Sequence, residues 1–149
     1  MRFLNAGSFA NAKRFSDEYD VEYDAKANKL RNFKLFIIMD TDDSSSELKS
    51  AYISGELFKG HWMSDYIVPI YNIENLEDVL VKAKLLEKRI SSTEKGRVYS
   101  RIFPINREKL GKDTVEQVSA FREAISGIAE TNMSDLVDYC LGLLEQFYD

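Results

Sequence analysis

Three aspartates lie within four residues at positions 40–43, DTDD, directly after the apolar run FKLFIIM at 33–39. Alternate residues of an extended segment point the same way, so the carboxylates of Asp40 and Asp42 can converge on one point. Crowded carboxylates repel each other unless a cation neutralises them, and oxygen ligands of this kind suit Mg²⁺. The pattern therefore predicts a divalent-cation site with Asp40, Asp42 and Asp43 as ligands, for Mg²⁺ or alternatively Mn²⁺.

The same aspartates also have a purely structural interpretation. Aspartate is common in turns that lead from a strand into a helix, and capping the helix can be the whole role of such a carboxylate. Ser44 and Glu47 form the S-x-x-E pattern of a capping box, so we expect Ser44 to be the cap. Both interpretations of the aspartates stay open on the sequence alone.

A second acidic segment, NIENLED at 72–78, follows the next apolar run. Ligand sites in open α/β sheets lie at the carboxyl ends of the strands, and neighbouring parallel strands end at the same edge. We therefore expect this segment to lie close to the aspartates at 40–43. Acids in the first turn of a helix also complement the helix dipole, and that interpretation of Glu77 and Asp78 is equally open.

The elements that must position these acids alternate between strands and helices, which is typical of a mostly parallel α/β sheet. We expect four or more strands, Rossmann-like in arrangement, with flanking helices and two further helices at the carboxyl end, all in one domain spanning 1–149. Ile37 and Ile38 should be buried on opposite faces of a central strand. The expected strands are 2–4, 33–39, 66–70 and 98–105. The expected helices begin near residues 8, 44, 75, 113 and 132, and the segments 20–32 and 87–97 are expected to be loops.

Composition narrows the functional classes. The chain has 149 residues, 44% of them apolar and 30% charged, which indicates a globular protein. No apolar run approaches the roughly 20 residues that span a bilayer, so no membrane partner is expected. The net charge of −5 argues against a broad basic surface that coats nucleic acid. The single cysteine, Cys140, allows no internal disulfide, and we expect a cytoplasmic location.

The segments FIIMDTDD at 36–43 and PIYNIENLEDVL at 69–80 together resemble the Toprim fold. The likeness is greatest to the small RloB-like, Toprim-related proteins of prokaryotic defence and mobile-element systems, and it covers about residues 2–85. The resemblance implies a metal-dependent, nuclease-like domain that acts on nucleic-acid phosphodiesters, or a degenerate relative of one. It assigns Asp40 and Asp42 as metal ligands and catalytic residues, with Asp43 and Glu77 as further candidates, and it implies nucleic acid and a protein partner or second copy as partners.

The chain departs from the Toprim pattern at its first strand. Toprim proteins carry a glutamate there, usually followed by glycine, whereas this chain opens with MRFLNAGSF. Either the glutamate is missing, or the strand that bears it precedes Met1.

Two other functions fit the same residues. In a phosphatase or phosphotransferase resembling the haloacid dehalogenases, Asp40 would be the nucleophile and Asp42 the general acid, although MDTDDSS matches their D-x-D-x-[ST] pattern imperfectly. In a noncatalytic interaction protein, the acidic residues would be present but would not catalyse a reaction. His61 is the only histidine, so the sequence gives little support to a catalytic triad or a metal site built on histidine.

Overall fold

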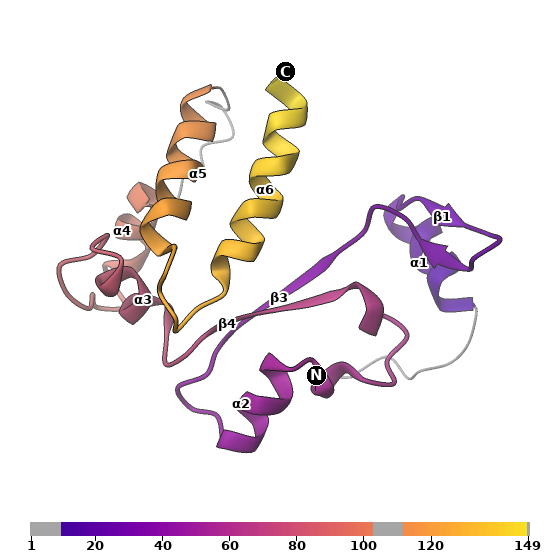
Figure 1. Cartoon of the computed structure of the whole chain (residues 1–149), viewed down its shortest axis with the longest axis horizontal. Coiled ribbons are helices and arrows are strands. Elements are labelled where there is room, and N and C mark those ends of the chain that lie inside the picture. Colours follow the sequence, from indigo (N-terminus) through magenta and orange to yellow (C-terminus); the bar gives the residue numbers. More distant parts are fainter. Residues whose placement is uncertain (1–9, 103–111, 149) are drawn as a thin grey trace. The chain divides into compact units, whose positions relative to one another are not determined.

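The computed structural model of the protein describes residues 10–102 and 112–148 (Figure 1). The chain folds into two compact units. The described part of the first unit comprises residues 10–37 and 44–69, and that of the second comprises residues 38–43, 70–102 and 112–148. The acidic segments at 40–43 and 72–78 both belong to the second unit.

The first unit starts with helix α1 (Ala10–Tyr19) and a short antiparallel hairpin. Strands β1 (Tyr23–Asp24) and β2 (Lys29–Leu30) form this hairpin within the segment that the sequence predicted to be a loop. The turn closes because the Asp24 carboxylate accepts hydrogen bonds from the backbone N–H groups of Lys26 and Ala27, and Asn28 adopts a positive φ of 51°. These local bonds form a hairpin without apolar alternation, so the prediction of a loop was wrong.

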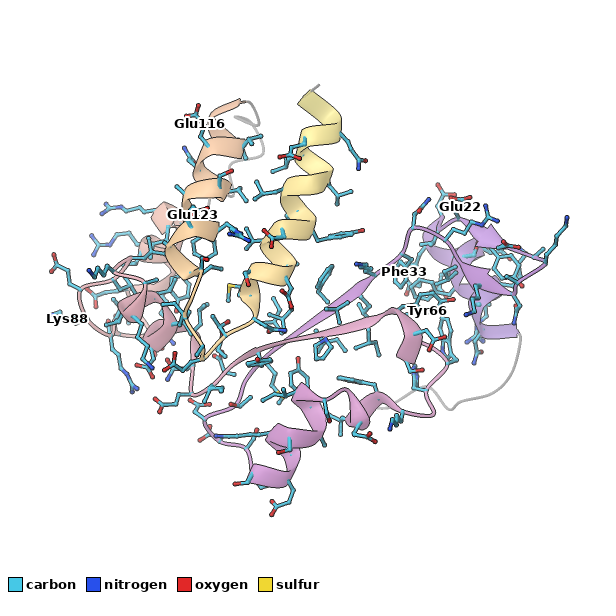
Figure 2. The ribbon with its side chains drawn as sticks, in the orientation of Figure 1. Glu22, Phe33, Tyr66, Lys88, Glu116 and Glu123 are labelled. Atoms are coloured by element: carbon cyan, nitrogen blue, oxygen red, sulfur yellow. The ribbon has the colours of Figure 1, made fainter. Side chains whose placement is uncertain are left out.

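A cluster of half-buried aromatic side chains packs together in the first unit. The ring centroids of Phe33 and Tyr66 (labelled in Figure 2) lie 5.8 Å apart. Those of Phe15 and Trp62 lie 5.7 Å apart, and both pairs are edge to face. Helix α2 (Ser46–Ile53) and the 3-10 turns η1 (Glu56–Phe58) and η2 (Ser64–Tyr66) complete this unit. Tyr52 of α2 is buried, and its hydroxyl donates a hydrogen bond to the carbonyl oxygen of Ile37.

Strands β3 (Leu35–Asp40) and β4 (Ile67–Asn72) pair in parallel, and each begins in the first unit and ends in the second. The α/β class and the order of these two strands are therefore as predicted. Pro69 is tolerated because a two-stranded sheet needs no donor on its outer edge. Ile38 is 56% exposed, so the prediction that it is buried in a central strand was wrong. Its neighbour Ile37 is only half-buried, so the prediction of burial was wrong for this residue too.

The predicted four-stranded parallel sheet is not present in the residues that the structure describes. They contain one parallel and one antiparallel sheet of two strands each. The expected strand at 2–4 lies outside the described residues, and residues 98–102 belong to helix α4 (Lys95–Ile102). Val98 and Ile102 are four residues apart and so share one helical face, a spacing that the prediction of a strand overlooked.

The second unit also contains helices α3 (Leu76–Lys82), α5 (Lys112–Ile125) and α6 (Met133–Tyr148). Helices α5 and α6 lie side by side as an antiparallel pair (Figure 1), joined on their exposed surface by an ion pair between Arg122 and Asp138. The buried apolar residues are Ile70, Val79, Leu80, Phe121, Ile125, Met133 and Val137. Within the described ranges, none of the helices has both the length and the apolar composition needed to cross a bilayer.

Candidate functional site

Backbone hydrogen bonds join the loop after β3 to the turn after β4. The N–H of Thr41 lies 3.1 Å from the carbonyl oxygen of Asn72 and 3.0 Å from that of Glu74, and the N–H of Asp42 donates to the Glu74 carbonyl at 3.0 Å. Thr41 is completely buried, and its hydroxyl donates to the Asn72 carbonyl as well. Glu74 holds a positive φ of 72°, which is uncommon for a residue other than glycine. The predicted proximity of the two acidic segments is therefore confirmed.

Asn72 is the polar centre of this junction. Its side chain is fully buried at the end of β4, and its Nδ2 donates a 2.9 Å hydrogen bond to Oδ1 of Asp40. Its Oδ1 lies 2.9 Å from the hydroxyl of Thr131, which also contacts the carbonyl oxygen of Tyr71. The chain between α5 and α6 is thereby bound to β4, and an antiparallel bridge pairs Asn72 with Thr131. The Asn72 side chain, which holds the carboxylate of Asp40, is thus itself held in place by Thr131.

Glu77 lies at the start of α3, which Asn75 caps by accepting a hydrogen bond from the N–H of Asp78. Its carboxylate forms an ion pair with Lys95 of α4, with 2.7 Å between Oε1 and Nζ. The Glu77 side chain is only 12% exposed, whereas that of Lys95 is 42% exposed. The bond to Glu77 is the main cause that raises the pKa of Lys95, and the negative charge of Asp40 adds to it. Asp40 and Glu77 therefore act on the same ammonium group.

Tyr99 stands one helical turn after Lys95 and belongs to the same neighbourhood. Burial is the main cause that raises the pKa of its hydroxyl, and the negative charges of Glu77 and Asp40 raise it further. The site thus contains two carboxylates, one ammonium and one neutral phenol. Sequence reasoning missed Lys95 and Tyr99 because it placed them in a loop and a strand. The available signal was their spacing of four residues, which puts both on one face of a helix.

The remaining aspartates of the first cluster are exposed at the surface. Asp42 accepts a hydrogen bond from the N–H of Asp43 through its Oδ1, which is a local turn contact. Helix α2 begins at Ser46 and is capped by Ser45, whose hydroxyl accepts a hydrogen bond from the N–H of Leu48. The predicted cap at Ser44 was therefore wrong by one residue. Neither aspartate is the residue that caps α2, so capping does not account for them.

Asp78 is neutralised by a different partner. Arg89 contacts both of its carboxylate oxygens, and this hydrogen bonding is the main cause that lowers the pKa of Asp78. Arg89 also lies 3.8 Å from the carboxylate of Glu74. The basic segment around residue 89 thus folds back over the acidic turn, so these charges balance one another and leave Asp78 committed to an ion pair.

Within residues 10–102 and 112–148, no group of three or more Asp, Glu, His or Cys side chains is arranged to hold a metal ion. The predicted set of three aspartate ligands is thus not assembled. Mg²⁺ usually takes one or two protein carboxylates and keeps water on its other positions. The exposed carboxylates of Asp40 and Asp42 fit that smaller donor set, while Glu77 is already paired with Lys95.

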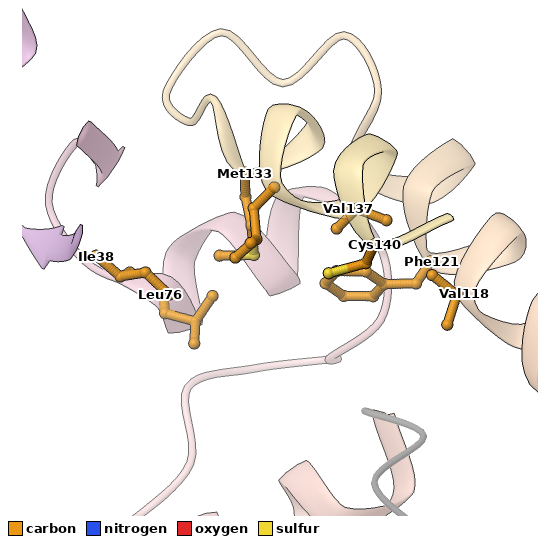
Figure 3. Close-up of a pocket in the computed structure, with 8 residues that line it drawn as sticks. Ile38, Leu76, Val118, Phe121, Met133, Val137 and Cys140 are labelled. Atoms are coloured by element: carbon orange, nitrogen blue, oxygen red, sulfur yellow. The ribbon is translucent and has the colours of Figure 1, made fainter. Parts of the chain in front are cut away.

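A separate apolar cavity of about 400 Å³ lies in the second unit (Figure 3). Ile38 and Leu76 line one end, and side chains from α5 and α6, among them Phe121, Met133 and Cys140, line the rest. Burial of the Cys140 thiol raises its pKa, although the residue as a whole is exposed. Apart from this thiol, the lining residues are all apolar, so the cavity is distinct in chemistry from the acidic junction.

No protein-family model matches the chain, and neither a curated protein nor a solved structure matches it significantly.

Proposed function

We propose that the chain is a Toprim-like domain that binds Mg²⁺ through Asp40 and Asp42 and acts on nucleic-acid phosphodiesters. The observation that supports this proposal most is the junction at the carboxyl ends of β3 and β4. There the DTDD and NIENLED segments are bonded together, and Asp40 and Glu77 influence one ammonium group. These are the two segments on which the resemblance to Toprim proteins depends.

The residues of the site have complementary tasks in this proposal. Asn72 fixes the carboxylate of Asp40, and the exposed Asp42 adds a second carboxylate on the same loop. A divalent cation bound there would polarise a phosphoryl oxygen and neutralise charge that develops on it. Lys95 would contact a second phosphoryl oxygen as a point charge. Since the net charge is −5, contact with nucleic acid would be confined to this site.

Replacing Asp42 with Asn tests the metal part of the proposal. We expect Mn²⁺ to raise the melting temperature of the wild type, because a ligand that binds only the native state stabilises it. D42N should melt at the same or a higher temperature without metal and lose most of the Mn²⁺-dependent shift. Asp65→Asn is the matched control, since Asp65 is an exposed acid in the first unit. An Mn²⁺ shift that D42N leaves intact would contradict the assignment of Asp42.

Cleavage assays test the catalytic part. Wild-type protein with Mg²⁺ or Mn²⁺ is expected to cleave single-stranded or duplex DNA or RNA, and D40N and D42N should lose that activity. Metal binding without cleavage of any of these substrates would instead favour the noncatalytic interaction protein.

One observation favours a second candidate, a phosphatase or phosphotransferase. Such sites pair the nucleophilic aspartate with a lysine and an acid from later in the chain, and Lys95 and Glu77 form a pair of this kind near Asp40. An oxygen of Asp40 would attack phosphorus to form an acyl phosphate while Asp42 protonates the leaving alkoxide, and water would then release phosphate. Hydrolysis of p-nitrophenyl phosphate but not of its bis-ester, with a phosphorylated Asp40 found by mass spectrometry, would establish this candidate over the first.

A further inference from the structure

A basic segment, residues 82–101, follows the acidic junction along the chain. It contains seven of the 20 lysines and arginines of the protein but only two of its 25 acids, although the net charge of the whole chain is −5. The segment runs from the last residue of α3 into α4, and all of it belongs to the second unit. Positive charge is therefore concentrated in the part of the chain that also supplies Lys95 to the site.

Three of the seven cations form ion pairs with acids outside the segment. They are Lys82, Arg89 and Lys95, which pair with Glu130, Asp78 and Glu77 respectively. In each pair the side chain of the acid is less exposed than that of the cation, at 12–37% against 42–63%. These pairs attach the segment to the rest of the second unit, and they neutralise the acids that the segment covers.

The other four cations of the segment are exposed. They are Lys84, Lys88, Arg97 and Arg101, of which Lys88 is labelled in Figure 2. Within the part of the chain that the structure describes, the only acid at ion-pair distance from any of the four is Glu94, 3.9 Å from Arg97. The Glu94 carboxylate also accepts hydrogen bonds from the N–H and the hydroxyl of Ser91. The four cations thus face solvent with little compensating negative charge.

Helix α4 presents two of these cations in a fixed arrangement. Arg97 and Arg101 are four residues apart, so they share one face of the helix and lie about 6 Å apart along its axis. A nucleic-acid strand presents about two phosphate charges over such a length. The apolar residues Val98 and Ile102 of this helix are half-buried, whereas a helix that binds a lipid surface exposes its apolar side chains. The exposed face therefore fits a phosphate backbone better than a membrane.

We propose that the exposed basic surface formed by Lys84, Lys88, Arg97 and Arg101 binds the phosphate backbone of nucleic acid without reading its base sequence. Such binding depends on the four charges alone, and a net charge of −5 confines it to a local concentration of cations like this one. Its purpose, to hold the strand that is cleaved at the acidic junction, rests on the proposed function.

Fluorescence anisotropy with labelled oligonucleotides in EDTA tests the surface without metal. Four phosphate contacts predict that a plot of the logarithm of the association constant against that of the salt concentration has a slope of about −3.6 for duplex DNA and about −2.8 for a single strand. Two double variants each remove half of the contacts, R97Q/R101Q and K84Q/K88Q. Each should halve the slope and weaken binding at least about tenfold at roughly 50 mM salt.

The matched control is R14Q/K26Q, which removes two exposed cations of the first unit and should bind like the wild type. Circular dichroism checks that every variant is folded. Unchanged binding in either double variant of the basic surface, or an equal loss in the control, would overturn the proposal. Binding of phosphatidylserine vesicles without binding of nucleic acid would assign the surface to a membrane and would overturn it as well.

The same variants separate this proposal from the proposed function. Nucleic-acid binding that depends on the basic surface in EDTA, without cleavage in Mg²⁺ or Mn²⁺, would support the surface and refute the catalytic part of the proposed function. Cleavage with an unchanged KM in both double variants would instead refute the surface and leave the proposed function intact.

Discussion

Asn72 offers the most direct test of how the acidic junction is held together. The side chain is fully buried and makes one hydrogen bond to the carboxylate of Asp40 and one to the hydroxyl of Thr131, each 2.9 Å long. Asn72→Ala removes both bonds without changing the charge of the protein. The residue lies in the parallel strand β4, so the change leaves the backbone contacts of Thr41 in place.

The expected loss of stability can be worked from these contacts. A neutral hydrogen bond contributes about 0.5–1.5 kcal/mol and one to a charged group about 1.5–3 kcal/mol. Asp40 is exposed and regains water when its partner is removed, so its share lies at the lower end. Thr131 keeps its contact with the Tyr71 carbonyl, which limits the cost on that side. We therefore expect Asn72→Ala to lower the free energy of unfolding by about 2–3 kcal/mol.

Urea denaturation followed by circular dichroism measures this change, provided the slope of the transition is the same in both proteins. A loss smaller than about 0.5 kcal/mol would refute the reasoning, because it would mean that neither bond stabilises the native state. Ile73→Ala is a suitable control, since Ile73 is the exposed neighbour of Asn72 and its side chain can be shortened with little loss.

Asn72→Asp extends the same test to pH dependence. The new carboxyl group would be buried next to Asp40, and both burial and the like charge raise its pKa above the unfolded value of about 3.9. Because the pKa of the new carboxyl group is higher in the folded state, its charge costs no stability below the unfolded pKa. The loss of stability grows as pH rises from the unfolded pKa towards the folded pKa. The variant should therefore be less stable than Asn72→Ala at pH 7 and approach it near pH 4. A deficit that does not change with pH would contradict this argument.

Three further predictions follow from local contacts. Ser45→Ala should lower the unfolding free energy by about 1 kcal/mol in urea melts and Ser44→Ala should lower it less, because Ser45 caps α2; the reverse order would restore the sequence-based cap. Arg89 lowers the pKa of Asp78, so the ion pair stabilises the native state above pH 4 and stops doing so as pH falls through the lowered pKa. Arg89→Met should therefore lose less stability below pH 4 than the wild type does, and an equal loss in both proteins would contradict the pairing. The raised pKa of Cys140 predicts slower alkylation by iodoacetamide at pH 8 than that of free cysteine, and an equal rate would argue against burial of the thiol.

Several elements could be predicted from the sequence because their signals are local. The apolar run before Asp40 gives β3, Asn75 caps α3, and apolar residues at the helical period give α5 and α6. Turns and helix caps were predicted less well, because they depend on which individual side chain bonds to the backbone. The hairpin at 23–30 forms through the carboxylate of Asp24, and the cap of α2 lies at Ser45, one residue beyond the position that the motif indicated.

The sequence by itself determined which acids stand at the ends of two strands, since a strand followed by a polar turn is a local pattern. Only the tertiary structure decided what those acids contact. Asn72 and Thr131 meet across 59 positions of the chain, and Glu77 and Lys95 meet across 18. Such contacts depend on where each helix is placed by its packing, and no pattern of neighbouring residues encodes that placement. The same packing turns the expected strand at 98–102 into part of α4 and brings Lys95 to the carboxylate of Glu77, where burial makes a counter-charge necessary.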